Sequence, residues 1–374
     1  MRILTKSGEK MLIPDKSCGI IWIYKHLTDT VRQGTGCSMK KARILVVSSA
    51  NIDFVQRMRR VPYSGETVVE TGESYSYVPG GKGANSAITF ARFGADTVFT
   101  CRVGRDSNGR RLKAIYEREG IDTRYIQEDP EVPTGLASIL VEENGKNRII
   151  VYPGANMTMS EEDIEAGFTC YPDALYLQLE IPDAAVIEAC RRANQDGIPV
   201  FIDAGPARMD FPLDKLGRVE VFSPNENETR IFTGISPANE DSCIRAAVKL
   251  STLVDAKYIV LKLGERGSFI YDGAEYWSIP AERVKAVDTT AAGDVFSAVM
   301  TYVYLQNGNI VSAVKYATCA AALSVTRPGA STSIPMLEEV VAYARNKVAA
   351  ENGEVAQADG SGAPADAEEG TEKA

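Results

Sequence analysis

The chain has 374 residues, 44% of them apolar and 24% charged, which is the composition of a globular protein with one large or two small domains. The formal net charge is −9 and Lys and Arg form no clustered stripe, which argues against nucleic acid as the main partner. The seven cysteines include no C-x-x-C pair, which argues against a metal cluster or a disulfide framework and favours a reducing, cytoplasmic location.

The sequence contains one histidine, His26. A Ser-His-Asp triad, a histidine-ligated zinc or a histidine general base is therefore nearly excluded, and acid–base chemistry falls to Asp, Glu, Lys, Tyr or Cys. No apolar run approaches the ~20 residues of a membrane-spanning helix, so we expect no membrane partner.

The two ends of the chain differ from its middle. Residues 1–42 are basic and show no clear periodicity. A weak organellar transit peptide is one interpretation, but Met39 begins a natural start, MKKARILVV, which favours an N-terminal extension outside the fold. Residues 350–374 are rich in Ala, Gly, Asp and Glu and are predicted to be a disordered acidic tail. The folded domain is expected to span residues 43–349.

Within that span, short apolar β runs alternate with helical stretches. The β runs lie at 44–48, 97–101, 174–179, 199–203, 219–223 and 258–263. The helical stretches lie at 84–93, 107–119, 183–196 and 241–254, followed by 292–306, 310–326 and 335–349. This alternation predicts an α/β fold with a doubly wound, mainly parallel sheet and helices on both faces.

Two regions interrupt the alternation. Residues 65–78 are β-like with polar residues at alternate positions, and residues 136–152 contain two β runs around Asn144-Gly145, a strong hairpin signal. Together with residues 52–63 they are predicted to form a small separate sheet, a lid or dimerisation surface with segments near 52–78 and 134–152. An extension of the main sheet's edge is the alternative. The lid is favoured because these segments are two-faced and the main strands are not.

Polar residues follow the predicted strands at their carboxyl ends, where open α/β sheets bind ligands. They are Ser49, Asn51 and Asp53 after the first strand, then Glu180, Asp203, Asn225, Lys262 and Gly264 after later ones. Any one of them could be a turn residue. The fold would bring all of them to one rim, which favours a binding site there.

The segment PGGKGAN, residues 79–85, precedes a predicted helix. It matches neither the G-x-x-x-x-G-K-[ST] phosphate loop nor the dinucleotide fingerprint. A flexible turn that caps the helix and a loop whose amides and Asn85 contact a polyhydroxylated substrate are equally consistent with this segment.

The segment DTTAAGD, residues 288–294, precedes an apolar helix whose first turn is predicted at about residues 291–294. Amides at a helix N-terminus are unpaired and carry partial positive charge. Ala291, Ala292 and Gly293 have no bulk to shield these amides, so the segment predicts an anion hole for a phosphoryl group in transfer. Asp294 can accept the proton of an attacking hydroxyl. A plain first-turn acid would account for Asp294 but not for the small residues before it.

Residues 225–228, NENE, open another predicted helix. Asn225 and Glu228 could hold Mg²⁺ through water, but Glu228 is almost as well explained as an ordinary first-turn acid.

Together, GGKGAN at 80–85 and DTTAAGD at 288–294 resemble the two signatures of the ribokinase (PfkB) family of sugar and nucleoside kinases, and the likeness covers roughly residues 43–345. The resemblance implies an ATP-dependent kinase, a phosphotransferase with an alcohol acceptor, built as an α/β sandwich with a small β lid. The Lys-Gly-Ala-Asn and Ala-Ala-Gly-Asp variants look most like the family members that phosphorylate the 5-hydroxyl of D-ribose. Deoxyribose, a fructose-type sugar or a nucleoside stays open as acceptor.

The resemblance also implies roles for single residues. Asp294 would be the general base, and the amides of Ala291, Ala292 and Gly293 would stabilise the moving phosphoryl group. The sugar would be held by Asn51, Asp53, Gly80, Gly81, Lys82, Asn85, Glu180 and Asp294. ATP would contact Asn225, Lys262, Gly264, Glu265, Gly267, Gly293 and Thr318, and Glu228 would organise Mg²⁺. An activating monovalent cation, usually K⁺, would lie among Asp288, Thr290, Ser324, Arg327, Gly329 and Ser333.

Two positions depart from the family pattern. Thr318 stands where histidine is often found near the adenine, and Asp203 stands where asparagine is common.

A nicotinamide-dependent oxidoreductase is disfavoured because no glycine fingerprint follows the first strand. A non-catalytic sugar-binding protein is disfavoured because Asp294 and its small neighbours are intact. We expect a homodimer formed through the β lid.

Overall fold

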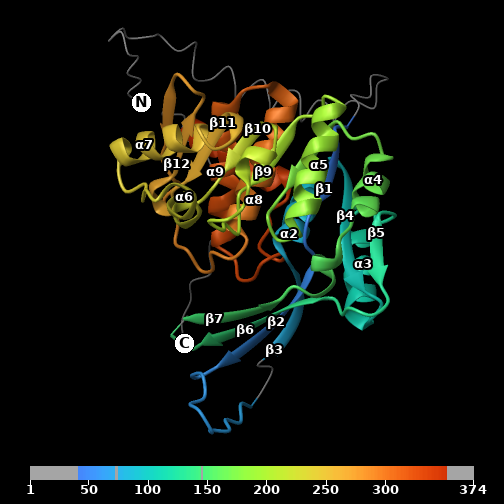
Figure 1. The fold of residues 1–374 in the computed structure, drawn as a ribbon. Helices are drawn as coiled ribbons and strands as arrows, with labels where there is room; N and C mark the ends of the chain where they lie inside the picture. Colours follow the sequence, from blue (N-terminus) through green and yellow to red (C-terminus); the bar gives the residue numbers. More distant parts are fainter. Residues whose placement is uncertain (1–40, 72–74, 145, 352–374) are drawn as a thin grey trace, which may run out of the picture.

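In the computed structural model, residues 41–71, 75–144 and 146–351 are described. They form two sheets, a large one flanked by helices and a small one that extends away from it (Figure 1). The expected N-terminal extension and acidic tail lie almost entirely outside these residues.

The large sheet has the order β13-β12-β11-β10-β9-β8-β1-β4-β5. Its parallel part runs from β11 to β5. The bounds are β1 Arg43–Val47, β4 Asp96–Gly104, β5 Ile126–Asp129, β8 Ala174–Leu177, β9 Val200–Asp203, β10 Arg218–Ser223 and β11 Asp255–Lys262. The antiparallel edge is made by β12 Ser268–Tyr271 and β13 Tyr276–Ile279. Strands such as β1, RILVV, are apolar on both faces because helices cover both sides of a parallel sheet.

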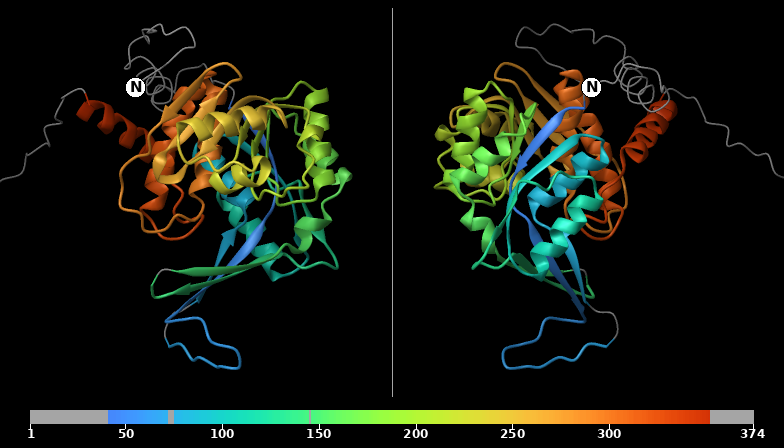
Figure 2. Two further views of the ribbon diagram at one scale, coloured as in Figure 1. Left: turned by 60° about the vertical axis from the view of Figure 1, so that its left-hand side comes forward. Right: turned by 90° about the vertical axis from the view of Figure 1, so that its right-hand side faces the viewer.

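Helices cover the two faces of this sheet. On one face α2 Lys82–Arg92, α8 Ala292–Asn307 and α9 Ile310–Val325 pack together, and α10 Leu337–Glu351 contacts α9. On the other face lie α4 Glu161–Phe168, α5 Asp183–Gln195, α6 Glu226–Thr233 and α7 Glu240–Ser251 (Figure 2). Helix α3 Ser107–Arg118 contacts β4. Short 3₁₀ turns are η1 Gly154–Thr158, η2 Leu213–Lys215 and η3 Gly264–Arg266. The predicted doubly wound architecture is confirmed.

The small sheet has the order β3-β2-β6-β7, with β2 Asn51–Met58, β3 Tyr75–Gly80, β6 Gly135–Glu142 and β7 Asn147–Tyr152. Strands β6 and β7 form the predicted hairpin around Asn144, and β2 joins it through parallel pairing with β6. The sheet is separate from the main one, so the alternative of an edge extension is wrong.

Several predicted boundaries need correction. The expected lid segment 52–63 is a strand only as far as Met58, and among the described residues of segment 65–78 the strand begins at Tyr75. The alternating polar residues before it do not lead to a strand, because Pro62 lacks the amide hydrogen that a strand donates and Gly65 turns the chain with φ 78°. Strands β5, β12 and β13 and helix α4 were not predicted, because each is too short for its periodicity to stand out.

Candidate active site

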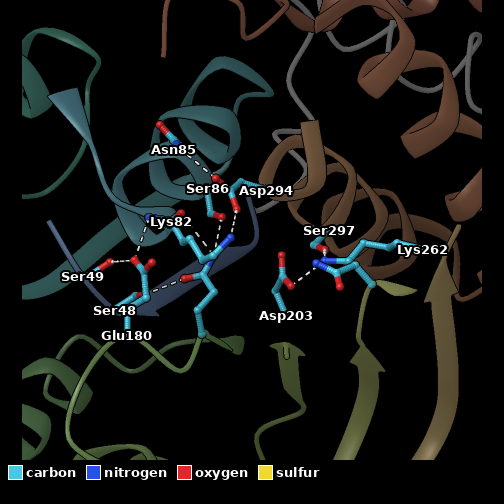
Figure 3. A network of polar contacts seen from close by, with 12 residues as sticks. Ser48, Ser49, Lys82, Asn85, Ser86, Glu180, Asp203, Lys262, Asp294 and Ser297 are labelled. Carbon is cyan, nitrogen blue, oxygen red and sulfur yellow. Dashed lines mark hydrogen bonds and ion pairs between the residues drawn. The ribbon is translucent and has the colours of Figure 1, made fainter. Parts of the chain in front are cut away.

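The carboxyl ends of the parallel strands bring the predicted polar residues to one rim of the large sheet. Figure 3 shows side chains from the ends of β1, β9 and β11 beside residues of α2 and α8 and beside Glu180, which follows β8. Residues separated by up to 209 positions in the sequence are in hydrogen-bond contact there. The rim predicted from the strand ends is therefore formed in the structure.

Asp294 lies in the first turn of α8 and is only 4% exposed. Its Oδ2 accepts a hydrogen bond from Asn85 Nδ2 at 2.8 Å, and its Oδ1 lies 3.5 Å from Lys82 Nζ. Both partners come from the GGKGAN segment, which forms the start of α2. The two sequence signatures thus meet at one carboxylate (Figure 3).

The start of α8 is left open. The residue before it, Ala291, adopts the left-handed conformation with φ 63°, and no side chain caps the helix. A Cβ built on Gly293 would meet only Lys262 Nζ, at 3.8 Å. The Ala292 amide donates a long hydrogen bond of 3.3 Å to the Thr289 carbonyl oxygen. Helix-start amides carry partial positive charge, and the absence of a side chain over them is what an anion hole requires.

The charges around Asp294 act on its protonation in opposite directions. Burial raises the pKa of Asp294 above its usual value, Lys82 and the hydrogen bond from Asn85 oppose that rise, and the carboxylates of Asp203 and Glu180 add to it. The pKa of Lys82 is raised, mainly by Asp294. The pair therefore keeps a buried carboxylate that can still take up a proton, which suits a general base.

The expected sugar side contains a second buried carboxylate, Asp53, which is 7% exposed. It lies against the backbone of Gly80, where a Cβ would come within 2.0 Å of Asp53 Oδ1. Burial, with added repulsion from Glu180 and Asp294, raises the pKa of Asp53 to about 7. Glu180 nearby accepts hydrogen bonds from Ser49 Oγ at 2.5 Å and from the Lys82 amide at 3.1 Å.

Gly81 and Gly83 allow α2 to approach the end of β1. Gly81 has φ 89°, and a Cβ on Gly83 would lie 2.5 Å from the Cβ of Ser48. The close approach places the amide of Lys82 beside Glu180. The glycines of GGKGAN therefore bring backbone and Asn85 to the rim, and Gly81 is at the same time the N-cap residue of α2. Contact of this segment with a polyhydroxylated substrate stays a prediction.

Sequence reasoning missed two buried amides that support these residues. Asn156 Nδ2 donates to Asn51 Oδ1 at 2.7 Å, and Asn156 Oδ1 accepts from the Ala50 amide. Gln178 accepts from Ser48 Oγ at 2.6 Å and donates to the Lys82 carbonyl at 3.1 Å. Gln178 could have been noticed, because it is a polar residue inside the apolar run YLQL. Asn156 follows the hairpin, and no sequence pattern marks it.

The expected nucleotide side includes the starts of α6 and η3. Asn225 caps α6 in a reciprocal pair with Glu228: the Glu228 amide donates to Asn225 Oδ1 at 2.9 Å, and the Asn225 amide donates to Glu228 Oε2 at 2.7 Å. Gly264 and Gly267 flank the turn after β11, with Glu265 exposed between them. A Cβ on Gly267 would lie 2.0 Å from the Ile279 carbonyl oxygen, so the turn requires glycine.

Thr318, expected near the adenine, is 7% exposed on α9. Its hydroxyl donates to the Val314 carbonyl of the same helix at 2.8 Å. The Thr318 hydroxyl is therefore used within α9, and a contact of this residue with adenine stays a prediction.

The surroundings of Glu228 agree only in part with its expected role in binding Mg²⁺. It is 5% exposed, and burial raises its pKa despite the opposing charge of Lys262. Its Oε1 is directed toward Gly205, where a Cβ would come within 2.2 Å. Among the described residues no group of three or more His, Cys, Asp or Glu side chains could hold a metal ion. Mg²⁺ is commonly held by one or two carboxylates together with phosphate oxygens and water, and Glu228 can supply one of these.

The two segments expected to hold a monovalent cation lie side by side. Asp288 accepts hydrogen bonds from the Thr290 amide and hydroxyl at 2.9 and 2.6 Å, and from the Gly329 amide at 2.9 Å. Burial acts to raise the pKa of Asp288, but these hydrogen bonds outweigh it and the pKa is lowered. In the second segment the Ser324 and Ser333 hydroxyls are 2.9 Å apart.

The guanidinium of Arg327, in the same segment, pairs with Glu339. A guanidinium has no acceptor atom, so Arg327 could offer a cation only its backbone carbonyl oxygen.

The chain matches the pfkB family of carbohydrate kinases over residues 41–337. A ribokinase of Haemophilus influenzae is 34% identical over 304 residues, which cover 80% of this chain and 97% of that protein. The chain belongs to the pfkB carbohydrate kinase family. It is thus a phosphotransferase, and the resemblance seen in its two signatures is confirmed.

Solved structures agree with this membership. A structure of Arabidopsis thaliana ribokinase complexed with ribose and ATP superposes with a TM-score of 0.74 at 30% identity, covering 82% of this chain and 99% of that one. A ribokinase from Thermotoga maritima gives 0.71 at 34% identity, covering 82% and 100%.

Longer and differently named relatives also match. The chain spans 56% of a bifunctional ribokinase/ribose-5-phosphate isomerase A of Fructilactobacillus sanfranciscensis, to which it is 35% identical. A deoxyribokinase of Salmonella typhi is 32% identical over 304 residues, covering 80% of this chain and 98% of that protein. In the described residues no helix is long and apolar enough to cross a membrane.

Proposed function

We propose that this kinase transfers the γ-phosphoryl group of ATP to the 5-hydroxyl of D-ribose. The observation that carries the proposal is the meeting of Asn85, Lys82 and Asp294 at the open start of α8, in a chain whose relatives include ribokinases over most of its length. Asn51, Asp53, Glu180 and the backbone at Gly80 and Gly81 would hold the sugar hydroxyls.

In the proposed reaction Asp294 accepts the proton of the sugar's primary hydroxyl. The freed oxygen forms a bond to the γ-phosphorus, and the bond from that phosphorus to the oxygen bridging the β-phosphate breaks, which releases ADP. The amides of Ala291, Ala292 and Gly293 stabilise the charge on the three equatorial oxygens in transit. Lys82 lowers the pKa of Asp294 against the effect of burial and so favours its ionised form before the sugar binds.

Mg²⁺ and K⁺ are part of the proposal. Mg²⁺ would be held by Glu228, through water, together with the phosphates, and would neutralise their charge. K⁺ would be held near Asp288 by carbonyl and hydroxyl oxygens of residues 288–290 and 324–333. Its charge would steady the loop that leads into α8.

The small sheet is proposed to act as a lid over the sugar and as the surface of a homodimer. It contributes Asn51 and Asp53 to the site, and its outer strand β7 exposes Ile149, Ile150 and Tyr152 by 50–56%. Exclusion of water by the lid would prevent hydrolysis of ATP. The cytoplasm is the proposed location, where ATP is supplied and the buried cysteines stay reduced.

Deoxyribose is the second candidate acceptor, since a relative of similar identity is a deoxyribokinase. The two sugars differ by one hydroxyl. A site with a carboxylate placed for that hydroxyl would reject the analogue that lacks it, because the buried oxygen would be left unpaired.

The test is ATP consumption by the purified chain with Mg²⁺, using ribose, 2-deoxyribose, fructose, fructose 6-phosphate, adenosine and uridine, each with K⁺ and with Na⁺. We expect the highest kcat/KM on ribose and a rise of activity with K⁺. Higher kcat/KM on another acceptor would overturn the ribose assignment, and no turnover on any acceptor would overturn the proposed function.

A further inference from the structure

The rim contains a buried carboxylate, Asp203, that has no role in the reaction as proposed. Asp203 ends β9 and is 1% exposed. Its Oδ1 accepts a hydrogen bond from Lys262 Nζ at 2.5 Å, while its Oδ2 is buried and has no hydrogen-bond partner in the described part of the chain. A buried carboxylate with only one contact needs an explanation.

The contact fixes Lys262 beside the anion hole. Lys262 ends β11, and β10 lies between β11 and β9, so its side chain crosses one strand to reach Asp203. Its ammonium also donates to Ser297 Oγ at 3.3 Å. Ser297 lies three residues after Asp294 on α8, and a Cβ on Gly293 would be 3.8 Å from the ammonium nitrogen (Figure 3).

A purely structural role accounts poorly for this pair. Strands β9, β10 and β11 are already joined by their backbone ladders, so Asp203 and Lys262 are not required to hold them together. Burial of a lysine–carboxylate pair costs desolvation and side-chain entropy that hydrophobic residues would avoid. Phosphoryl transfer, in contrast, is catalysed mainly by positive groups that are already in place where negative charge develops in the transition state.

We propose that Asp203 is a positioning residue that holds the Lys262 ammonium at the mouth of the anion hole, where it meets the γ-phosphoryl group in transit. An ammonium has three protons. One is directed to Asp203 and one to Ser297, which leaves the third for a phosphoryl oxygen beside Gly293. No proton is transferred by Lys262, which contributes charge alone. The inference rests on the proposed function and deepens it.

The test compares Asp203→Asn, Lys262→Met and the double variant. Asp203→Asn keeps the shape and an oxygen acceptor but removes the charge that fixes the ammonium. We expect kcat to fall about 10- to 100-fold while KM for ATP stays within about threefold, because the effect falls on the transition state. Once Lys262 is methionine, adding Asp203→Asn should change kcat by less than twofold.

A second readout does not depend on turnover. The affinity for ADP alone should be unchanged in Asp203→Asn, and the affinity for ADP with aluminium fluoride and ribose, a mimic of the phosphoryl group in transit, should fall by a factor similar to that of kcat. If Asp203 acted on stability alone, Asp203→Asn would lower the melting temperature but would not weaken binding of the mimic more than binding of ADP.

Glu220→Gln is the matched control. It removes the charge from the Lys257–Glu220 contact of 2.6 Å between the neighbouring strands β11 and β10, a more exposed lysine–carboxylate pair away from the rim. Glu220 also accepts from the Tyr304 hydroxyl of α8, a hydrogen bond that glutamine can still accept. Its kcat should equal that of the wild type. If Asp203→Asn does not fold, Ser297→Ala tests the second contact of Lys262, with an expected two- to fivefold loss of kcat that disappears in the Lys262→Met background.

An Asp203→Asn variant with the kcat of the wild type would overturn the inference. So would a double variant in which the losses of kcat from Asp203→Asn and Lys262→Met multiply. Failure of the proposed function looks different: the wild type itself would then turn over none of the acceptors.

Discussion

Asp294 is held by one cation and one amide, Lys82 and Asn85, in surroundings that otherwise contain carboxylates. Burial raises the pKa of Asp294, while Lys82 and the hydrogen bond from Asn85 favour its ionised form. The opposing influences on its pKa therefore match what a base in phosphoryl transfer must do.

Replacing this carboxylate tests the base directly. We expect Asp294→Asn to lower kcat by about 10³-fold, within the range known for loss of a positioned general base, because asparagine cannot accept the proton. ADP affinity, measured by calorimetry, should be unchanged, since Asp294 lies on the sugar side. A variant that retains more than a tenth of the wild-type kcat would contradict the assignment.

If Asp53 binds the sugar as proposed, we expect sugar binding to depend on pH. Its raised pKa of about 7 means that it is protonated below neutrality and ionised above it. An ionised carboxylate accepts hydrogen bonds from two hydroxyls, so the Kd for ribose should rise about tenfold between pH 8 and pH 6. Calorimetry without ATP isolates this step from Asp294 chemistry. In Asp53→Asn the Kd should be weaker and independent of pH over that range.

Asp53 also makes the stability of the fold depend on pH, and here the protonated form is the more stable one. Because the folded-state pKa lies above the ordinary value of 3.8, the stabilising proton is bound at low pH and is lost as the pH rises toward about 7. The melting temperature of Asp53→Asn relative to the wild type should therefore increase from pH 4 to pH 7. A constant difference over that window would argue against a raised pKa in the folded protein.

Among the elements, the start of α8 and the turn after β11 each contain a glycine, and the two glycines differ in the space available for a Cβ atom. Gly293 has room for a methyl group, and Ala favours a helix over Gly by about 1 kcal/mol. Gly293→Ala should keep or raise the melting temperature while lowering kcat about tenfold or more, because the methyl group covers anion-hole amides. Gly267→Ala is the contrast: its Cβ would strike the Ile279 carbonyl, so stability should fall. Equal kcat in Gly293→Ala and wild type would show that these amides do not contact the phosphoryl group.

Sequence patterns predicted the elements that are long and strongly periodic. Apart from β5, the strands of the parallel sheet follow from their apolar runs, and apart from α4, the helices from residues 82 to 325 follow from amphipathic or small-residue stretches and helix-start signals. The edge strands β12 and β13 escaped prediction, because four residues do not establish a period. Polar residues at strand ends predicted the rim, since topology alone brings the ends together.

What the sequence could not supply is the pairing of side chains across the rim. That Lys262 reaches Asp203, or that Asn156 supports Asn51, depends on distances between elements far apart in the chain. Local patterns contain no information on such contacts. The departure at Asp203 was visible in the sequence, but its partner was not.

At the scale of the whole molecule, the face of the small sheet away from Asp53 exposes apolar side chains, among them Ile150 and Tyr77, beside the polar pair Gln56 and Ser138. The register Phe54–Ser138–Ile150 places Ile150 on that face, and Phe54 stacks on Tyr77 there with ring centroids 4.7 Å apart. Exposed apolar surface of this kind marks association in soluble proteins. The homodimer is expected to form here.

Ile150→Lys should convert the dimer to a monomer, as measured by size-exclusion chromatography with light scattering, because a lysine at the centre of the interface would be desolvated. Val248→Lys on α7 is the control, a similarly exposed apolar residue on the main body. A monomeric wild type would show the dimer to be wrong.

The continuity of β3 with α2 links the small sheet to the proposed base. Strand β3 ends at Gly80 and α2 begins at Lys82, so only Gly81 separates a strand of the small sheet from the helix that contacts Asp294 through Lys82 and Asn85. If the small sheet closes over the sugar as proposed, its movement would be transmitted through Gly81 to the first turn of α2. Binding of the acceptor would then also change the two contacts that act on the charge of Asp294.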